Sequence, residues 1–255
     1  MTGSTFAAAL GAERRKTTGA RVVATTTVLL VAGVALLAGA LTMAATHGNQ
    51  QVLDQLGPLS NRTGWPLLTG VVAQVTAAAA VLGFGVALGW MFGREFTDGT
   101  ITGLFALPVS RTTIAAAKIA VYLLWALAVA TLLTVLLGVV GLALRLGPLT
   151  GDVLAALARQ HVLTCLSAVV ALPTAWAATL GRGPLPGIAT AVGLIVIAQV
   201  MVVGGTGAWF PVAAPALWAL RPDAVSPVQL TLVATIPLVL LPVLLTTWHR
   251  LQLDR

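Results

Sequence analysis

The sequence predicts an all-α membrane protein with six membrane-spanning helices, and three observations lead to this fold class. Apolar residues make up 58% of the 255-residue chain and charged residues only 8%, whereas soluble domains carry about 25% charged residues. Mean hydropathy is +0.98. Apolar runs of about 20 residues or more recur between polar, turn-rich segments, and a helix of that length crosses the roughly 30 Å hydrocarbon core. We therefore expect one transmembrane domain over residues 1–255 with lipid as its main solvent.

The N-terminal segment, residues 1–21, is predicted to be an interfacial helix on the inner leaflet. Phe6, Ala9 and Leu10 can share one helix face, and basic residues follow them. A frayed basic tail is the alternative. The apolar run after it is too long for a signal peptide, whose apolar region has about 7–15 residues. The six spans are expected at residues 22–45, 67–92, 114–144, 161–180, 188–208 and 228–248.

The segments between these spans are read from their turn residues and prolines. Residues 47–65 form an outer loop. Residues 145–160 form a second outer segment, in which Asp152 caps a short surface helix ending near Arg159. Pro173 should kink the fourth span or free a backbone carbonyl. Residues 181–187 form a tight inner turn.

The stretch 209–227 is apolar but contains four prolines, and it is too short to cross and return. It predicts a short re-entrant or interfacial hairpin at the outer face, with Trp209 and Trp218 near the headgroups. Pro237 and Pro242 should bend the sixth span.

The distribution of basic residues sets the orientation, because cytoplasmic loops of membrane proteins are enriched in Lys and Arg. With the N-terminus inside, ten basic residues are inside and four outside, which together make the 14 of the chain. The inside set is Arg14, Arg15, Lys16, Arg21, Arg94, Arg111, Lys118, Arg182, Arg250 and Arg255, and the outside set is Arg62, Arg145, Arg159 and Arg221. Both termini are therefore expected in the cytoplasm of a multi-pass plasma (inner) membrane protein.

Several classes of chemistry are disfavoured. None of the seven acidic residues is expected at mid-membrane, so the carboxylate relay of many proton-coupled carriers is missing. His161 and Cys165, four residues apart, are the best nucleophile–base pair, but no orienting acid accompanies them. The histidines lack metal-ligand spacing, no G-x-x-x-x-G-K-[ST] loop is present, and scattered basic residues without aromatic platforms argue against nucleic acid. We expect no catalysis, metal or cofactor in this chain.

Two sets of residues within the spans are notable. Gln74 and Gln199 need hydrogen-bond partners in lipid, so they either bond another helix or line a solute path. Gly85, Gly89 and Gly93, spaced four apart, permit close helix packing inside the subunit or along a dimer seam.

The segment 93–118, between the second and third spans, is the long polar interruption on the basic side. Pro108 keeps its predecessor out of a helix, and Ser110 is placed to cap a helix beginning near Arg111. We expect a short helix, a break and a fresh helix start. An interfacial helix lying on lipid is the alternative. An apolar face of the segment is expected from Phe96, Ile101, Leu104 and Phe105, and its polar and turn residues include Arg94, Glu95, Thr97, Asp98, Gly99 and Thr100.

This segment resembles the permease subunits of type 2 ABC exporters, especially the bacitracin, lantibiotic-immunity and multidrug branch. The resemblance is carried by Glu95, Phe96, Gly99, Thr100, Leu104, Pro108, Ser110, Arg111 and Lys118. Outside this segment it is architectural. It implies that residues 95–107 include a coupling helix that docks on a separate ABC ATPase, and that residues 1–21 are the connecting helix.

The resemblance further implies two permease chains, identical or different, and two ATPase chains, with ATP and Mg bound by the ATPase. The expected function is export of an amphipathic or hydrophobic solute, such as a drug, a peptide antibiotic or a lipid-like molecule. The alternatives are a scaffold or sensor subunit that does not transport, and an ion-independent channel or lipid-handling protein.

Overall fold

The computed structural model describes residues 2–106 and 108–252, so Met1, Leu107 and the end of the chain with Arg255 lie outside the described residues. The described part is helical and contains no strand. Its first half comprises α1 (Thr2–Thr18), α2 (Arg21–Val28), η1 (Leu29–Gly33), α3 (Val34–Thr46), α4 (Gln50–Leu56), η2 (Gly57–Asn61), α5 (Gly64–Thr97), α6 (Ile101–Phe105) and α7 (Arg111–Ala143). Its second half comprises α8 (Gly151–Val170), α9 (Pro173–Leu180), α10 (Pro184–Val203), η3 (Gly207–Trp209), α11 (Ala214–Leu220), η4 (Pro222–Ala224), α12 (Pro227–Thr231), η5 (Leu232–Ala234) and α13 (Thr235–Arg250).

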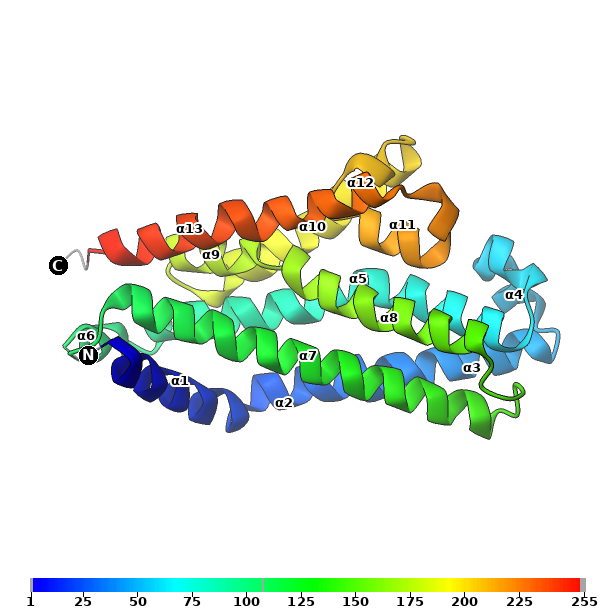
Figure 1. Ribbon diagram of the computed structural model, residues 1–255, viewed down its shortest axis with the longest axis horizontal. Helices are drawn as coiled ribbons and strands as arrows, with labels where there is room; N and C mark the ends of the chain where they lie inside the picture. Colours follow the sequence, from blue (N-terminus) through cyan, green and yellow to red (C-terminus); the bar gives the residue numbers. More distant parts are fainter. Residues whose placement is uncertain (1, 107, 253–255) are drawn as a thin grey trace.

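Six helical stretches of the described chain are long and apolar enough to cross a membrane, as the sequence predicted. They are Arg21–Thr46, Gly64–Thr97, Arg111–Ala143, Gly151–Leu180, Pro184–Val203 and Pro227–Arg250. They run roughly along one axis, with α1, α6 and the end of α13 at one end and α4 at the other (Figure 1). We call these the α6 end and the α4 end.

The expected surface helix between Asp152 and Arg159 is not a separate element. Helix α8 runs without interruption from Gly151 to Val170, and its N-cap is Thr150, whose side chain makes no capping bond. No proline or glycine follows Gly151 within the helix to end it near Arg159. The fourth apolar stretch therefore begins ten residues earlier than predicted.

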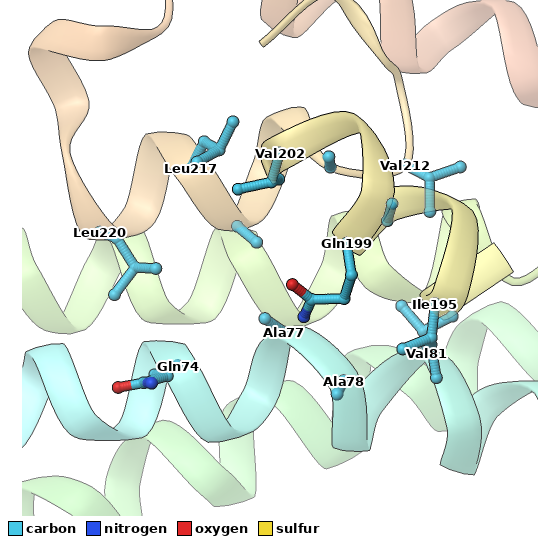
Figure 2. A pocket seen from close by; sticks show the side chains of 13 residues that line it. Gln74, Ala77, Ala78, Val81, Ile195, Gln199, Val202, Val212, Leu217 and Leu220 are labelled. Atoms are coloured by element: carbon cyan, nitrogen blue, oxygen red, sulfur yellow. The ribbon is translucent and has the colours of Figure 1, made fainter. Parts of the chain in front are cut away.

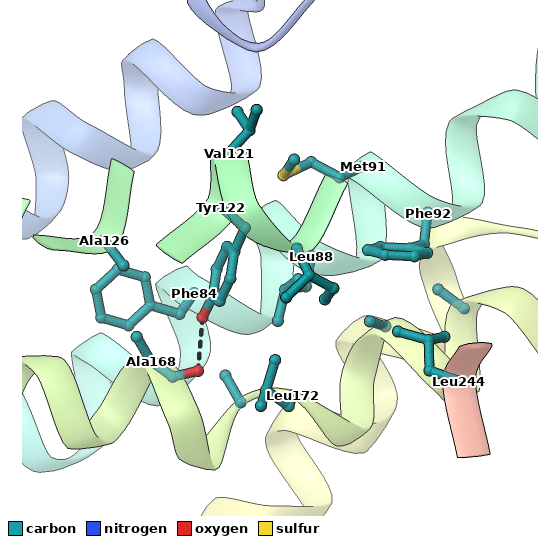
Figure 3. Packing of buried hydrophobic residues seen from close by; sticks show 14 of the residues in the cluster. Phe84, Leu88, Met91, Phe92, Val121, Tyr122, Ala126, Ala168, Leu172 and Leu244 are labelled. Atoms are coloured by element: carbon teal, nitrogen blue, oxygen red, sulfur yellow. Dashed lines mark hydrogen bonds between the residues drawn. The ribbon is translucent and has the colours of Figure 1, made fainter. Parts of the chain in front are cut away.

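The predicted effect of Pro173 is present. Proline has no N–H, so Pro173 cannot donate to the Val169 carbonyl four residues earlier. The Leu172 N–H bonds to Val169 O instead, and α8 ends at Val170. The Ala168 carbonyl accepts a hydrogen bond from the Tyr122 hydroxyl of α7, at 2.8 Å (Figure 3). The break thus becomes a cross-link between α7 and α8.

Aromatic and branched side chains fill the half of the bundle nearer α6. Phe84 of α5 is fully buried and meets Tyr122 edge to face, with ring centroids 6.1 Å apart. Phe92 meets Trp248 of α13 in the same manner at 5.7 Å, and Trp248 donates to Thr179 Oγ1. These contacts join α5, α7, α9 and α13 into one packed body (Figure 3).

The proline-rich stretch after α10 folds back on the bundle. Helix α11 packs against α5 and α8, while Trp209 remains largely exposed. In the last apolar stretch, the 3-10 turn η5 lies just ahead of Pro237, and Pro242 is inside α13.

Candidate functional site

Four charged side chains meet inside the bundle near the α6 end. They are Glu13 and Lys16 of α1, Glu95 of α5 and Lys118 of α7. These are the only two glutamates and the only two lysines of the chain. We call them the four-charge cluster.

The hydrogen bonds of the cluster join three helices. Lys118 Nζ donates to Glu13 Oε2 and Glu95 Oε1, both at 2.9 Å, and to the Met91 carbonyl at 3.1 Å. Lys16 Nζ donates to Glu13 Oε1 at 3.0 Å and to Glu95 Oε1 at 2.9 Å. All three protons of the Lys118 ammonium therefore have acceptors, and both carboxylates are bound by both lysines.

The charges of the cluster are largely buried, so their mutual compensation matters for stability. The Lys118 side chain is 1% exposed, that of Glu95 2% and that of Glu13 6%, whereas that of Lys16 is 34% exposed. Two positive and two negative charges cancel, and only paired charges of this kind are tolerated in such a place. Burial alone would lower the pKa of the Lys16 ammonium, but the Glu13 and Glu95 carboxylates raise this pKa above its ordinary value.

The cluster also holds the turn that leads to α6. Thr100 donates to Glu95 Oε2 at 2.6 Å, and Gly99 takes a φ of +67°, a conformation that glycine adopts without strain. Ile101 and Leu104 of α6 are buried against the core. The residues of the turn and of α6 that remain exposed are Thr97, Asp98, Gly99, Thr100, Thr102, Gly103 and Ala106.

The remaining predicted residues of this segment surround α6. The Arg94 guanidinium lies 4.6 Å from the Trp90 ring centroid, with Nε 3.6 Å from Asp98 Oδ2. The Arg111 guanidinium lies 4.0 Å from the Phe105 ring centroid and donates to the Leu251 carbonyl.

The break and fresh helix start expected in this segment are both present. Ser110 caps α7 as predicted, accepting from the Thr113 N–H. Pro108 lies exposed between α6 and α7, and Phe96 is half-buried.

A cavity of about 210 Å³ lies between α5, α10 and α11. Gln74 and Gln199 line it, and the rest of its wall is made of apolar side chains such as Ala77, Val81 and Leu217 (Figure 2). Neither glutamine has a hydrogen-bond partner for its side chain within the described ranges. The interhelix bond that the sequence offered as one use of these amides is therefore not formed.

The glycines spaced four apart on α5 lie against α9 and α10 of the same chain. A Cβ added at Gly85 would lie 2.5 Å from Ala191 Cβ, and one at Gly89 would lie 3.0 Å from the Pro184 carbonyl oxygen. A Cβ at Gly93 would lie 2.3 Å from the Gly183 backbone. The stripe thus serves packing within the subunit and brings α10 close enough to wall the cavity.

Sequence reasoning missed two polar features of the interior. It noted Glu13, Lys16 and Lys118 separately. The sequence shows that the chain has only two glutamates and two lysines, but not that these four side chains meet. It also placed Gln160 in a surface segment, whereas this side chain is 2% exposed and donates to Thr76 Oγ1 at 2.9 Å. The signal there was the uninterrupted helical stretch from Gly151.

The pairing of His161 with Cys165 is not formed. His161 Nδ1 lies 3.5 Å from Thr134 Oγ1, and no hydrogen bond joins it to Cys165 within residues 2–106 and 108–252. No group of three or more potential metal ligands occurs in the same ranges.

Six apolar helical stretches, with the four-charge cluster near one end, define a multi-pass membrane protein. Residues 10–198 match the family model described as ABC-2 family transporter protein. The match covers more than half of the chain, which therefore belongs to the ABC-2 transporter family. This family comprises membrane components of transport systems that are generally not catalytic themselves, and membership implies partnership with an ABC ATPase. The comparison with curated proteins and that with solved structures each gave no match.

Proposed function

We propose that this protein is the membrane-spanning subunit of an ATP-driven exporter and that the turn between α5 and α7 is the docking element for its ATPase. The observation that supports this proposal most strongly is the four-charge cluster behind the turn. Its hydrogen bonds join the end of α5, from which the exposed turn begins, to α1 and α7. A push on α6 would therefore move three helices together.

The docking surface would consist of the exposed small residues, while the charged residues behind it have a positioning role. Asp98, Gly99, Thr102 and Gly103 are exposed and could enter a groove of a partner. Glu95 is buried, so under this proposal it holds the turn in place and does not contact the ATPase. Helix α1, which packs on α7, would be the connecting helix at the same end.

The cavity between α5, α10 and α11 is the proposed solute path. Its apolar wall suits the body of a hydrophobic or amphipathic molecule, and the amides of Gln74 and Gln199 offer donors and acceptors for one polar group. Two permease chains, identical or different, and two ATPase chains that bind ATP and Mg would complete the transporter. Both termini would face the cytoplasm of the plasma membrane.

The test uses vesicles containing the chain and its ATPase, with uptake of a fluorescent amphipathic cation as the transport signal. Thr102→Arg places a large charged side chain on the exposed face of α6 and should abolish both ATP-dependent uptake and co-purification of the ATPase. Thr150→Arg is the matched control, because Thr150 is also exposed but lies at the α4 end and makes no capping bond.

The two variants separate the exporter from the alternatives. Normal insertion of Thr102→Arg with loss of transport supports docking through α6. Undiminished transport in Thr102→Arg would refute the docking assignment. ATPase binding by the wild-type chain without uptake of any solute would favour a scaffold or sensor subunit.

A further inference from the structure

A second polar hollow lies at the α4 end, away from the four-charge cluster. One cavity of about 240 Å³ is lined by residues of α5, α8 and the stretch around α11. A neighbouring cavity of about 180 Å³ shares Arg62, Thr69, Ala156 and Arg159 with it. We treat the two as one site, the arginine hollow.

Two guanidinium groups line this hollow without partners of their own. Neither Arg62 nor Arg159 makes an ion pair or a side-chain hydrogen bond with another described residue. The Arg62 guanidinium lies over α5 at Gly70, where an added Cβ would be 3.5 Å from Nη1. Asp152 is the one acidic residue among those lining the two cavities, so positive charge remains in excess.

Gln160 contributes a buried hydrogen-bonding group to the same hollow. Its side chain donates from Nε2 to Thr76, while Oε1 is buried and has no partner within the described chain. Burying a polar atom without a partner is unfavourable, so such an atom calls for an explanation. Rotating the amide by half a turn would let Thr76 donate to the oxygen and would leave the NH₂ group unpaired instead. Either way, one group of the Gln160 amide has no partner within the described residues.

We propose that the arginine hollow binds a phosphate-class anion. Two guanidiniums match the oxygens of a phosphate or phosphodiester, which they bind through charge-assisted hydrogen bonds. The Gln160 amide would bond a neighbouring hydroxyl or ester oxygen of the same molecule. The phosphodiester of a lipid headgroup and a free phosphate compound offer the same chemistry. This site does not depend on whether the chain exports a solute.

The location agrees with a ligand at headgroup depth. Arg62 precedes α5, and Arg159 lies two turns into α8, so both stand near the ends of apolar helices. Phospholipid headgroups lie in this interfacial layer, so the phosphodiester of a lipid would reach the hollow from the same depth.

The experiment is a binding titration of the purified protein in detergent, and native mass spectrometry measures the bound fraction. The three probes are short-chain phosphatidylglycerol, glycerol phosphate and inorganic phosphate. Tighter binding of phosphatidylglycerol identifies a lipid headgroup as the source, and equal or tighter binding of the two soluble probes identifies a free phosphate compound. Absence of binding by all three overturns the proposal.

The variants connect the signal to the hollow. The double change Arg62→Gln and Arg159→Gln should weaken binding by about tenfold or more, since it removes charge-assisted hydrogen bonds. Arg145→Gln removes one positive charge, half of the change in the double variant, at the same end from an exposed residue outside the hollow and should leave affinity unchanged. Equal losses in both variants would indicate a diffuse surface effect and overturn the proposal.

Gln160→Met distinguishes binding from packing. It keeps the size of the side chain and removes the whole amide, that is, the unpaired Oε1 and the Nε2 group that donates to Thr76. Weaker binding by the folded variant supports the proposed contact, even where loss of the bond to Thr76 lowers the melting temperature. A changed melting temperature with unchanged affinity would show that Gln160 serves packing alone and would remove it from the site.

Discussion

Replacing Lys118 by methionine tests the buried charge balance directly. The substitution keeps the length of the side chain but removes an ammonium that donates three hydrogen bonds, to Glu13, Glu95 and the Met91 carbonyl. The remaining cluster then holds two carboxylates and one ammonium. Removing one partner from a buried ion pair costs about 3–5 kcal/mol, because the other charge is left uncompensated.

The cost should appear as a large shift in thermal unfolding. For a chain of this size, 1 kcal/mol shifts the melting midpoint by about 2–4 °C, so Lys118→Met should melt about 10 °C below the wild type. Tryptophan fluorescence of the purified protein in detergent measures the midpoint. Arg145→Met is the control, because it removes a positive charge from an exposed residue at the α4 end.

A second substitution separates charge from packing. In Lys118→Met combined with Glu95→Gln, one negative and one positive charge remain, so the double variant should recover part of the lost stability. A coupling of about 0.5–3 kcal/mol between the two changes is the expected size for residues in contact. A midpoint for Lys118→Met within about 2 °C of the wild type, or a double variant less stable than either single one, would refute the reasoning.

Three further predictions concern packing, a buried carbonyl and pH. Gly93→Ala should destabilise the fold by about 1–3 kcal/mol or more, because the added Cβ would lie 2.3 Å from backbone atoms. Gly193→Ala is the control and should not destabilise the fold, because no atom lies within 4 Å of its added Cβ. Equal unfolding midpoints for the two variants would contradict this prediction. Tyr122→Phe should cost about 1–3 kcal/mol by leaving the Ala168 carbonyl unpaired, and an unchanged midpoint would count against that bond. Lys16→Met should be less stable than the wild type at neutral pH. Because folding raises the pKa of Lys16, its contribution is full below the ordinary value of 10.5 and is lost as pH rises through the folded-state value. Unfolding midpoints that differ equally at neutral and strongly alkaline pH would contradict the pairing.

Composition and the lengths of the apolar runs predicted the fold class and the six apolar stretches well, because lipid imposes a strong and simple requirement on length and polarity. The cap at Ser110 and the break at Pro173 were also predictable, since each follows from the local chemistry of one residue. The start of the fourth stretch was not. Arg159 and Gln160 appeared to mark a surface, but a buried partner on another helix accommodates Gln160.

Only part of the candidate site could be predicted from the sequence. The turn between α5 and α7 could be found from its charges, glycine and proline. Its link to α1 could not, because residues 13 and 95 are brought together by tertiary packing that no local pattern encodes. The same limit applies to the cavity, whose two glutamines lie on helices far apart in the chain.

Photo-cross-linking to the ATPase tests the central proposal most directly. A photoreactive amino acid is placed at Thr102, on the exposed face of α6, or at Thr150, at the α4 end, in the assembled complex. The account predicts a covalent product with the ATPase from position 102 and none from position 150. No product from position 102, or equal products from both, would contradict it.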